Sequence, residues 1–208
     1  MSRSIGILKL GVGNVHAIQC AVDILGFENR FVSREACLDD LAAVVIPGVS
    51  HFDELYERLC NINFSKFLES VVFGGRHTKV LGICSGFHVL CSGSEETERG
   101  YSGFGVFDLD VTRLRSLDNG KPTTHNSWRV ISQPGEVEKR MYFNHSFAVG
   151  SQDGNNIETL FLKNLGNISI AAEIENITGV QFHPEKSGRD GLNYLNRFCS
   201  EAVRIASD

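Results

Sequence analysis

The sequence predicts one α/β domain over residues 1–208, built in three layers: a mostly parallel central sheet, helices on both of its faces, and antiparallel hairpins in the C-terminal half. Up to about residue 105, short apolar runs alternate with segments of helical spacing, an order typical of βαβ units. Residues 42–46 are apolar at every position, as expected for a strand buried on both faces. Beyond residue 105, short strand-like segments follow one another across Gly-, Asn- or Pro-bearing turns, which predicts hairpins.

The first half of the chain alternates strands and helices. Residues 4–10 form an apolar strand, and a turn at 11–14 leads into a helix whose apolar positions recur at helical spacing up to Leu25, with Gly26 as its C-cap. Further strands are predicted at 29–32, 42–46 and 80–83, and helices at 52–59 and 64–73. The glycines of the first turn suggest a phosphate cradle. The third glycine of G-x-G-x-x-G is missing, so a close backbone turn is favoured.

The second half is predicted to be mainly β-structure followed by one helix. Strands are expected at 106–113, 128–132, 142–149, 157–162, 169–174 and 179–182. Residues 190–205 then carry apolar side chains at helical spacing: Leu192, Leu195, Phe198, Val203 and Ile205. This pattern predicts an amphipathic terminal helix that packs its apolar face on the sheet.

Composition excludes several classes of function. The net charge is −5 and no run of Lys or Arg occurs, which argues against a nucleic-acid-binding protein. The longest apolar stretches are far shorter than the ~20 residues that cross a bilayer. The six cysteines show no C-x-x-C spacing, so neither a zinc ribbon nor a thioredoxin-type site is indicated. The N-terminus looks like a first strand rather than a signal peptide, and we expect reduced thiols in the cytoplasm.

Residues 80–90, VLGICSGFHVL, contain the first candidate for chemistry. A short apolar run breaks at Cys84, between Gly82 and Gly86, and an apolar segment resumes at Phe87. This is G-x-C-x-G, the thiol counterpart of the G-x-S-x-G elbow between a strand and a helix. The elbow strains the backbone of its central residue, so small flanking residues are expected. Cys84 is therefore a candidate nucleophile, with a buried structural cysteine as the alternative.

Residues 179–185, GVQFHPE, supply possible partners for that thiol. An apolar strand leads to His183, and Glu185 follows two positions later. A thiol nucleophile needs an imidazole to take its proton and return it to a leaving amine, and the imidazole needs an acceptor that fixes its tautomer. Cys84 and His183 would meet if both strands end at the same edge of the sheet. A histidine at a strand end is by itself more often structural, so the prediction depends on the combination of motifs.

The turn Pro47-Gly48-Val49-Ser50 after the third strand is the last of these motifs. Gly48 lets a peptide N–H turn outward, so the loop can present backbone donors to an oxyanion. Pro-Gly is also an ordinary turn between a strand and a helix, which is the alternative reading.

With these motifs in this order, the chain resembles the class I glutamine amidotransferases of the triad type. Among them it is most similar to the glutaminase subunits of imidazole glycerol phosphate synthase in histidine biosynthesis. The matching segments span almost the whole chain: G-x-G-N at 11–14, P-G-V-x-H-F at 47–52, L-G-I-C-x-G at 81–86, S-E-E at 94–96, Y-F-x-H-S-F at 142–147 and G-V-Q-F-H-P-E-K-S at 179–187.

The resemblance implies a role for each site residue. Cys84 would attack the carboxamide of glutamine, His183 would carry the proton, and Glu185 would orient the imidazole. The tetrahedral oxyanion would be stabilised by backbone N–H groups at Gly48, Val49 and Ser85. The glutamine substrate would be bound by Ser50, His88, Glu96, His145, Ser146 and Phe147.

The resemblance also implies partners. No metal and no organic cofactor is expected. The ammonia would pass through a channel to a (βα)8-type cyclase or synthase subunit in a heterodimer, with Trp128 and Lys186 at the interface. A conformational change at the P-G-V loop could couple glutamine hydrolysis to the partner's ligand. Neither nucleic acid nor a membrane is expected as a partner.

The chain departs from the family pattern in three places. The elbow, usually C-L-G-M-Q, reads CSGFH, so His88 replaces a glutamine that would contact substrate. Ser50 replaces the second glycine of P-G-V-G, and the stretch usually reading P-H-x-G-W-N is THNSWR at 124–129. These changes leave two alternatives open: a paralogous subunit that supplies ammonia for amidated sugars of surface polysaccharide, and a non-catalytic regulatory subunit. A cysteine peptidase of the same fold is disfavoured, since it need not carry the H-P-E and S-E-E blocks together.

Overall fold

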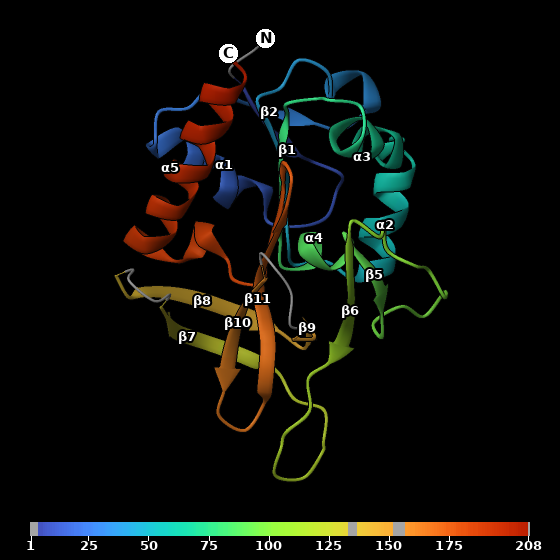
Figure 1. The fold of residues 1–208 in the computed structure, drawn as a ribbon, viewed down its shortest axis with the longest axis vertical. Coiled ribbons are helices and arrows are strands. Elements are labelled where there is room, and N and C mark those ends of the chain that lie inside the picture. Colours follow the sequence, from blue (N-terminus) through green and yellow to red (C-terminus); the bar gives the residue numbers. More distant parts are fainter. Residues whose placement is uncertain (1–3, 133–136, 152–156, 208) are drawn as a thin grey trace.

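The computed structural model describes residues 4–132, 137–151 and 157–207. Its central sheet contains the strands β1 (Ile5–Leu8), β2 (Asn29–Val32), β3 (Ala43–Ile46), β4 (Lys79–Ile83), β10 (Ile157–Leu162), β11 (Gly166–Ile174) and β12 (Ile177–Val180). Their order is β10-β11-β12-β4-β3-β1-β2. From β12 to β2 the strands run parallel, and β11 and β10 extend one edge antiparallel. Figure 1 shows the sheet nearly edge-on between two groups of helices, which confirms the predicted fold class.

Side chains of the parallel strands alternate between two separate cores. In β3, Ala43 and Val45 belong to one cluster of buried residues, and Val44 and Ile46 belong to the other. Successive side chains in a strand point to opposite faces. A strand that is apolar at every position therefore requires cover on both faces of the sheet.

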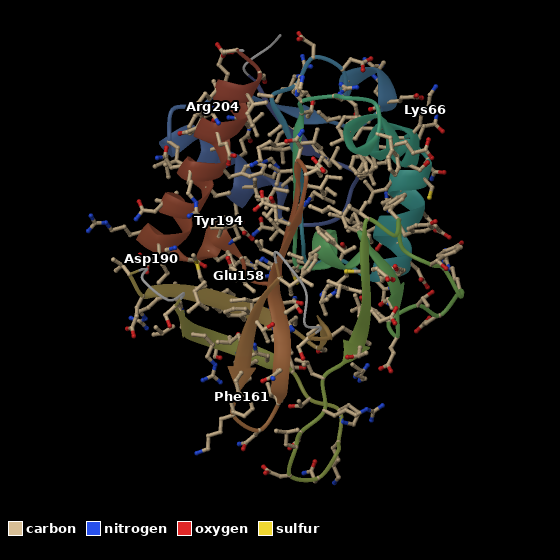
Figure 2. The ribbon with its side chains drawn as sticks, viewed as in Figure 1. Lys66, Glu158, Phe161, Asp190, Tyr194 and Arg204 are labelled. Atoms are coloured by element: carbon tan, nitrogen blue, oxygen red, sulfur yellow. The ribbon has the colours of Figure 1, made fainter. Side chains whose placement is uncertain are left out.

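Helices supply that cover (Figure 1). On one face lie α1 (Val15–Ile24) and α5 (Gly188–Ile205), and on the other lie α2 (Phe52–Cys60) and α3 (Phe64–Val72). Leu195 and Phe198 of α5 are buried in the core that also contains Ala43 and Val45, which confirms the predicted amphipathic face. Tyr194, labelled in Figure 2, packs its ring 5.2 Å from that of Phe182, next to the end of β12. No helix within the described ranges is long and apolar enough to span a membrane.

The remaining strands form two small sheets. One contains β5 (Cys91–Ser94), β6 (Phe107–Arg113) and β9 (Phe147–Val149), and the other pairs β7 (His125–Ile131) with β8 (Lys139–His145). The expectation that hairpins extend the central sheet therefore holds only for β10 and β11. The single strand predicted at 142–149 is interrupted at Ser146, because β8 pairs with β7 whereas β9 pairs with β6. Short elements complete the described chain: α4 (Ser85–His88) and the 3₁₀ turns η1 (Glu35–Cys37) and η2 (Pro184–Lys186).

Gly179 of β12 has no room for a side chain. An added Cβ would lie 2.0 Å from Cδ2 of Phe87, whose ring is fully buried. Gly179→Ala is expected to lower the free energy of unfolding by about 1–3 kcal/mol, the usual cost of overpacking a core. Urea unfolding measures the loss. Gly150→Ala is the control because its Cβ would meet only the Asp110 carbonyl, at 3.8 Å. An equal loss in both variants would contradict the argument.

Candidate active site

The candidate site lies where three neighbouring strands end. Because β3, β4 and β12 are adjacent and parallel, their carboxyl ends reach the same edge of the sheet. Val180 lies opposite Ile83 in the ladder. The segments that follow these strands begin at Pro47, Cys84 and Gln181 and so emerge side by side. Open α/β sheets characteristically bind their ligands at such an edge.

Cys84 has the strained backbone that the elbow pattern predicts. Its φ of 51° and ψ of −109° connect β4 directly to α4. The neighbouring glycines are required by close contact: a Cβ on Gly82 would lie 2.5 Å from the Gly86 carbonyl oxygen, and one on Gly86 would lie 2.4 Å from that of Ile46. Strain of this kind persists only where surrounding structure enforces it, and it concentrates at functional sites. Cys84 as a whole residue is only 5% exposed.

His183 and Glu185 form a buried pair behind the thiol. His183 Nδ1 lies 2.9 Å from Glu185 Oε1, and both side chains are almost fully excluded from solvent. An ionised carboxylate can only accept, so Nδ1–H is the donor and Nε2 is left toward the site. A Cβ built on Gly48 would lie 2.8 Å from Cys84 Cβ and 3.2 Å from His183 Cε1. The side chains of Cys84 and His183 therefore both lie next to Gly48.

Opposing effects set the protonation of His183. Burial disfavours the charged imidazolium and lowers the pKa, whereas hydrogen bonding and charge from Cys84 and Glu185 raise it. The raising effects together outweigh burial, and the pKa of His183 rises to about 9. His183 Nε2 is buried, and within the described residues it has no side-chain partner other than the neighbouring thiol. The geometry is suited to an imidazole that accepts and returns a proton beside Cys84.

The loop after β3 is also strained. Val49 has a φ of 70°, an outlying value for a β-branched residue. The Ser50 N–H donates to Ser85 Oγ at 3.3 Å, and the two hydroxyl oxygens are 3.0 Å apart. The serine that replaces a family glycine therefore ties this loop to the residue that follows Cys84.

A cavity of about 500 Å³ opens over Cys84. It brings together nine of the residues predicted for the site: Val49, Ser50, Cys84, Ser85, His88, Glu96, His145, Ser146 and Phe147. Four further lining residues were not predicted: His51, Arg113, Thr124 and Asn144. Arg113 is a single polar residue at the end of a strand, and nothing in its sequence surroundings distinguishes it. Thr124 is the first residue of the segment 124–129 that departs from the family pattern, and that departure could have drawn attention to it. Within the described parts of the chain, no cluster of three or more His, Cys, Asp or Glu side chains could hold a metal ion.

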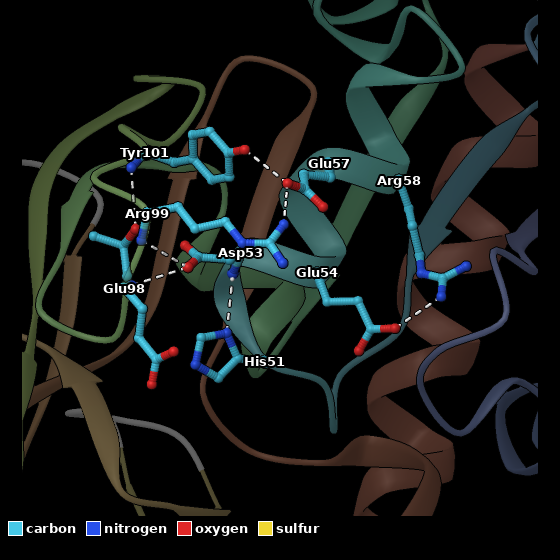
Figure 3. Close-up of polar contacts among 9 residues, drawn as sticks. His51, Asp53, Glu54, Glu57, Arg58, Glu98, Arg99 and Tyr101 are labelled. Carbon is cyan, nitrogen blue, oxygen red and sulfur yellow. Dashed lines mark hydrogen bonds and ion pairs between the residues drawn. The ribbon is translucent and has the colours of Figure 1, made fainter.

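A clamp from α2 holds the loop that follows β5 (Figure 3). Asp53 Oδ2 accepts the backbone N–H groups of Glu98 at 2.9 Å and Arg99 at 3.1 Å. Burial raises the pKa of Asp53, but the hydrogen bonds that its carboxylate accepts outweigh burial and lower it. Further along the helix, Glu57 accepts from the Tyr101 hydroxyl at 2.7 Å and pairs with the Arg99 guanidinium. The loop is thus fixed against α2 at several points.

Glu96 is the residue that this clamped loop directs toward the cavity. Burial raises the pKa of Glu96, opposed by the charge of His51 and by the backbone N–H of Phe52. A partly buried carboxylate in the lining of a cavity is suited to receive an ammonium group.

His88 is linked to the Cys84 thiol through the side chain of Gln181. His88 Nε2 lies 2.9 Å from Gln181 Oε1, and Gln181 Nε2 lies 3.7 Å from Cys84 Sγ. Burial lowers the pKa of His88 to about 4, so the ring is neutral and its Nε2–H donates to the amide. Gln181 was not predicted as a site residue, although it stands within the GVQFHPE motif and that motif could have drawn attention to it.

Trp128 and Lys186 do not line the cavity. Trp128 on β7 is 45% exposed, and its ring is 5.8 Å from that of Tyr142, which is 6.3 Å from the His183 ring. Lys186 donates its backbone N–H to the His183 carbonyl at 3.0 Å. Of the two residues predicted for a partner interface, Lys186 thus bonds to His183 directly, whereas Trp128 reaches it only through the Tyr142 ring.

Comparison with known sequences identifies the family. The family described as "Glutamine amidotransferase class-I" matches residues 7–202. The chain belongs to the class I glutamine amidotransferases. As an amidotransferase of this class it is a glutamine-hydrolysing enzyme. Its solved structural neighbours include one described as "glutamine amidotransferase", with a TM-score of 0.72 and 18% identity over 98% of this chain and 99% of that one. At that identity the likeness shows the fold.

Two relatives of this amidotransferase carry the name "Imidazole glycerol phosphate synthase subunit HisH". The protein from Leptospira interrogans is 32% identical over 206 residues, and that from Leptospira borgpetersenii is 30% identical over 207. Each alignment covers 94% of this chain and 99% of the relative. A second structural neighbour is PurLQS from Thermotoga maritima, with a TM-score of 0.66 and 17% identity over 99% of this chain and 97% of that one.

Proposed function

We propose that this amidotransferase is the glutaminase subunit of a two-component synthase that makes imidazole glycerol phosphate in histidine biosynthesis. The observation that carries the proposal is the convergence of Cys84, His183 and Glu185 at one sheet edge beneath the cavity. The relatives named as synthase subunits support the choice of pathway. The reaction uses these side chains and needs no metal or organic cofactor. We place the enzyme in the cytoplasm.

The proposed reaction proceeds through a thioester. Cys84 first gives its proton to His183 Nε2, and its sulfur then bonds to the carboxamide carbon of glutamine. The C–N bond then breaks as His183 returns the proton to nitrogen, which leaves as ammonia. Water, deprotonated by the same imidazole, hydrolyses the thioester to glutamate and the free thiol. Glu185 holds the Nδ1–H tautomer and stabilises the imidazolium that forms in each step.

Substrate recognition is assigned to the walls of the cavity. Backbone N–H groups at Gly48, Val49 and Ser85 stabilise the oxyanion, and the strain at Val49 reflects the orientation that this requires. Six other residues of the cavity lining bind glutamine: Ser50, His88, Glu96, His145, Ser146 and Phe147. Among them, Glu96 and residues 145–147 hold its amino-acid end. Glu96 receives the ammonium group.

The partner is proposed to be a (βα)8-type cyclase in a heterodimer, docked over Trp128 and Lys186. Trp128 is a large aromatic side chain left 45% exposed, the kind of residue that dominates interfaces. Ammonia released at Cys84 then passes directly into the partner. The segment 124–129, which contains Trp128, departs from the family pattern, and this departure favours a second candidate: a paralogous subunit that supplies ammonia for amidated sugars of surface polysaccharide.

The test is glutamate release from glutamine by the chain alone and with an imidazole glycerol phosphate cyclase and its nucleotide ligand. We expect little hydrolysis alone and strong stimulation by the liganded partner, because the strained loop at Val49 can respond to docking. Hydrolysis that the cyclase does not stimulate would favour the polysaccharide-pathway partner. No hydrolysis under any condition would favour the third alternative, a non-catalytic regulatory subunit.

A further inference from the structure

Hydrogen bonds tie strand β7 and the residue before it to one wall of the cavity. Thr124 Oγ1 lies 2.7 Å from Ser146 Oγ, and His125 Nδ1 lies 3.0 Å from His145 Nε2. His145 Nδ1 bonds in turn to the Phe147 carbonyl oxygen at 2.9 Å. Both histidines are buried. Because residues 145–147 line the cavity, the network connects β7 to the wall assigned to glutamine.

The outer end of this network is formed by two residues at which the chain departs from its family. Ser127 Oγ lies 2.9 Å from His125 Nε2, and Arg129 Nε lies 3.3 Å from the same nitrogen. The family motif P-H-x-G-W-N has glycine and asparagine at these two positions. The two departures therefore meet at one atom of a buried histidine.

The hydrogen-bonding groups at the two ends of this network, the Phe147 carbonyl and the Arg129 guanidinium, determine which nitrogen of each histidine carries a hydrogen. A carbonyl oxygen only accepts, so His145 Nδ1 carries a hydrogen, and a guanidinium only donates, so His125 Nε2 is an acceptor. In neutral rings, His125 Nδ1–H must then donate to His145 Nε2. Both imidazoles are Nδ1–H tautomers. The reverse direction would require an imidazolium at His145 and would place two N–H groups of His125 and Arg129 against each other.

The surroundings keep this pair of histidines neutral. Burial lowers the pKa of His125 to about 4, and the charge of Arg129 lowers it further. Burial lowers the pKa of His145 to about 3, with smaller contributions in the same direction from His125, His88 and His183.

We propose that Ser127 and Arg129 are positioning residues for the glutamine pocket. By donating to His125 Nε2 they hold the His125–His145 pair in its Nδ1–H form and so fix residues 145–147 against bound glutamine. Without these donors, the His125 proton can move to Nε2, and His145 Nε2 then loses its hydrogen bond. The inference rests on the proposed glutaminase function and adds to it a determinant of glutamine affinity.

The test compares Arg129→Leu, Ser127→Gly and the double variant in the complex at saturating partner. Arg140→Leu is the matched control. It removes a guanidinium from the neighbouring strand β8, where that group lies 5.7 Å from the Trp128 ring rather than against the histidines. Ring ¹⁵N spectra of the full chain report the histidine tautomers independently of activity. Arg129→Lys keeps an N–H donor and tests for rescue.

Either donor can partly replace the other, so we expect each single substitution to raise KM for glutamine about twofold to fivefold. The double variant leaves a buried acceptor unpaired and should raise it on the order of tenfold to a hundredfold, with kcat little changed. The spectra should show Nδ1–H at both histidines in the wild type and loss of that form at His125 in the double variant. Arg129→Lys should restore most of the affinity.

Two results would overturn the inference: Nε2–H tautomers in the wild type, or a double variant whose KM and spectra match those of Arg140→Leu. Failure of the wild type to hydrolyse glutamine would instead refute the proposed function, while the tautomer spectra would still decide the structural assignment.

Discussion

Replacing Cys84 with alanine is expected to lower the rate of glutamine hydrolysis by at least about 10³-fold, the order of loss seen when a triad nucleophile is removed. Without sulfur no thioester can form, and the remaining groups can only orient water. The Cβ position and the elbow are kept, so glutamine binding should change little. Steady-state glutamate release and isothermal titration with glutamine separate the two effects.

Cys91→Ala is the control for this experiment. Cys91 is also buried, but its sulfur lies 3.5 Å from the Phe87 carbonyl, and burial raises the pKa of its thiol. Its removal should leave kcat within a few-fold of the wild type. If Cys84→Ala retained the wild-type rate, the assignment of the nucleophile would be wrong.

Glu185→Gln is expected to lower kcat roughly 10²- to 10⁴-fold with a smaller change in KM, as when the carboxylate of a catalytic triad is replaced by an amide. The amide can present N–H to His183 Nδ1 and so favour the wrong tautomer, in which Nε2 cannot accept the Cys84 proton. It also removes one of the two partners that raise the pKa of His183 to about 9. The pH profile of kcat/KM for the variant measures this second effect.

The same pair predicts a pH dependence of stability. The pKa of His183 is raised above its ordinary value of 6.5, so its contribution to folding is complete below about pH 6.5 and is lost as pH rises through about 9. Glu185→Gln should therefore be less stable than the wild type at pH 6, and the difference should shrink by pH 10. Urea unfolding at both values provides the measurement. A difference independent of pH would show that His183 does not contribute in this way.

The strands and the placement of the candidate site residues could be predicted because their signals are local. The apolar run 42–46, the elbow around Cys84 and the GVQFHPE segment each indicate a conformation within a few residues, and the parallel sheet brings their ends together. The bounds of β2 agree with the prediction, and those of β6 begin one residue later.

What could not be predicted depends on contacts between distant segments. The interruption at Ser146 arises because β8 and β9 pair with different strands, and the segment 142–149 itself contains no breaking residue. The Asp53 clamp and the Gln181 contact with Cys84 join residues 45 and 97 positions apart. Positive φ at Val49 runs against its β-branched side chain, so local preference gives the wrong expectation there.

The burial of Cys84 has a consequence for covalent chemistry with reagents. Cys20 and Cys60 are exposed, whereas Cys84 is 5% exposed and lines the cavity. Bulky general alkylating agents will therefore label the two surface thiols first, whatever their intrinsic nucleophilicity. An electrophile with the size and polarity of glutamine can enter the cavity and reach Cys84. Its selectivity would be determined by shape, which makes the lining of the cavity the part of this protein that an irreversible inhibitor should match.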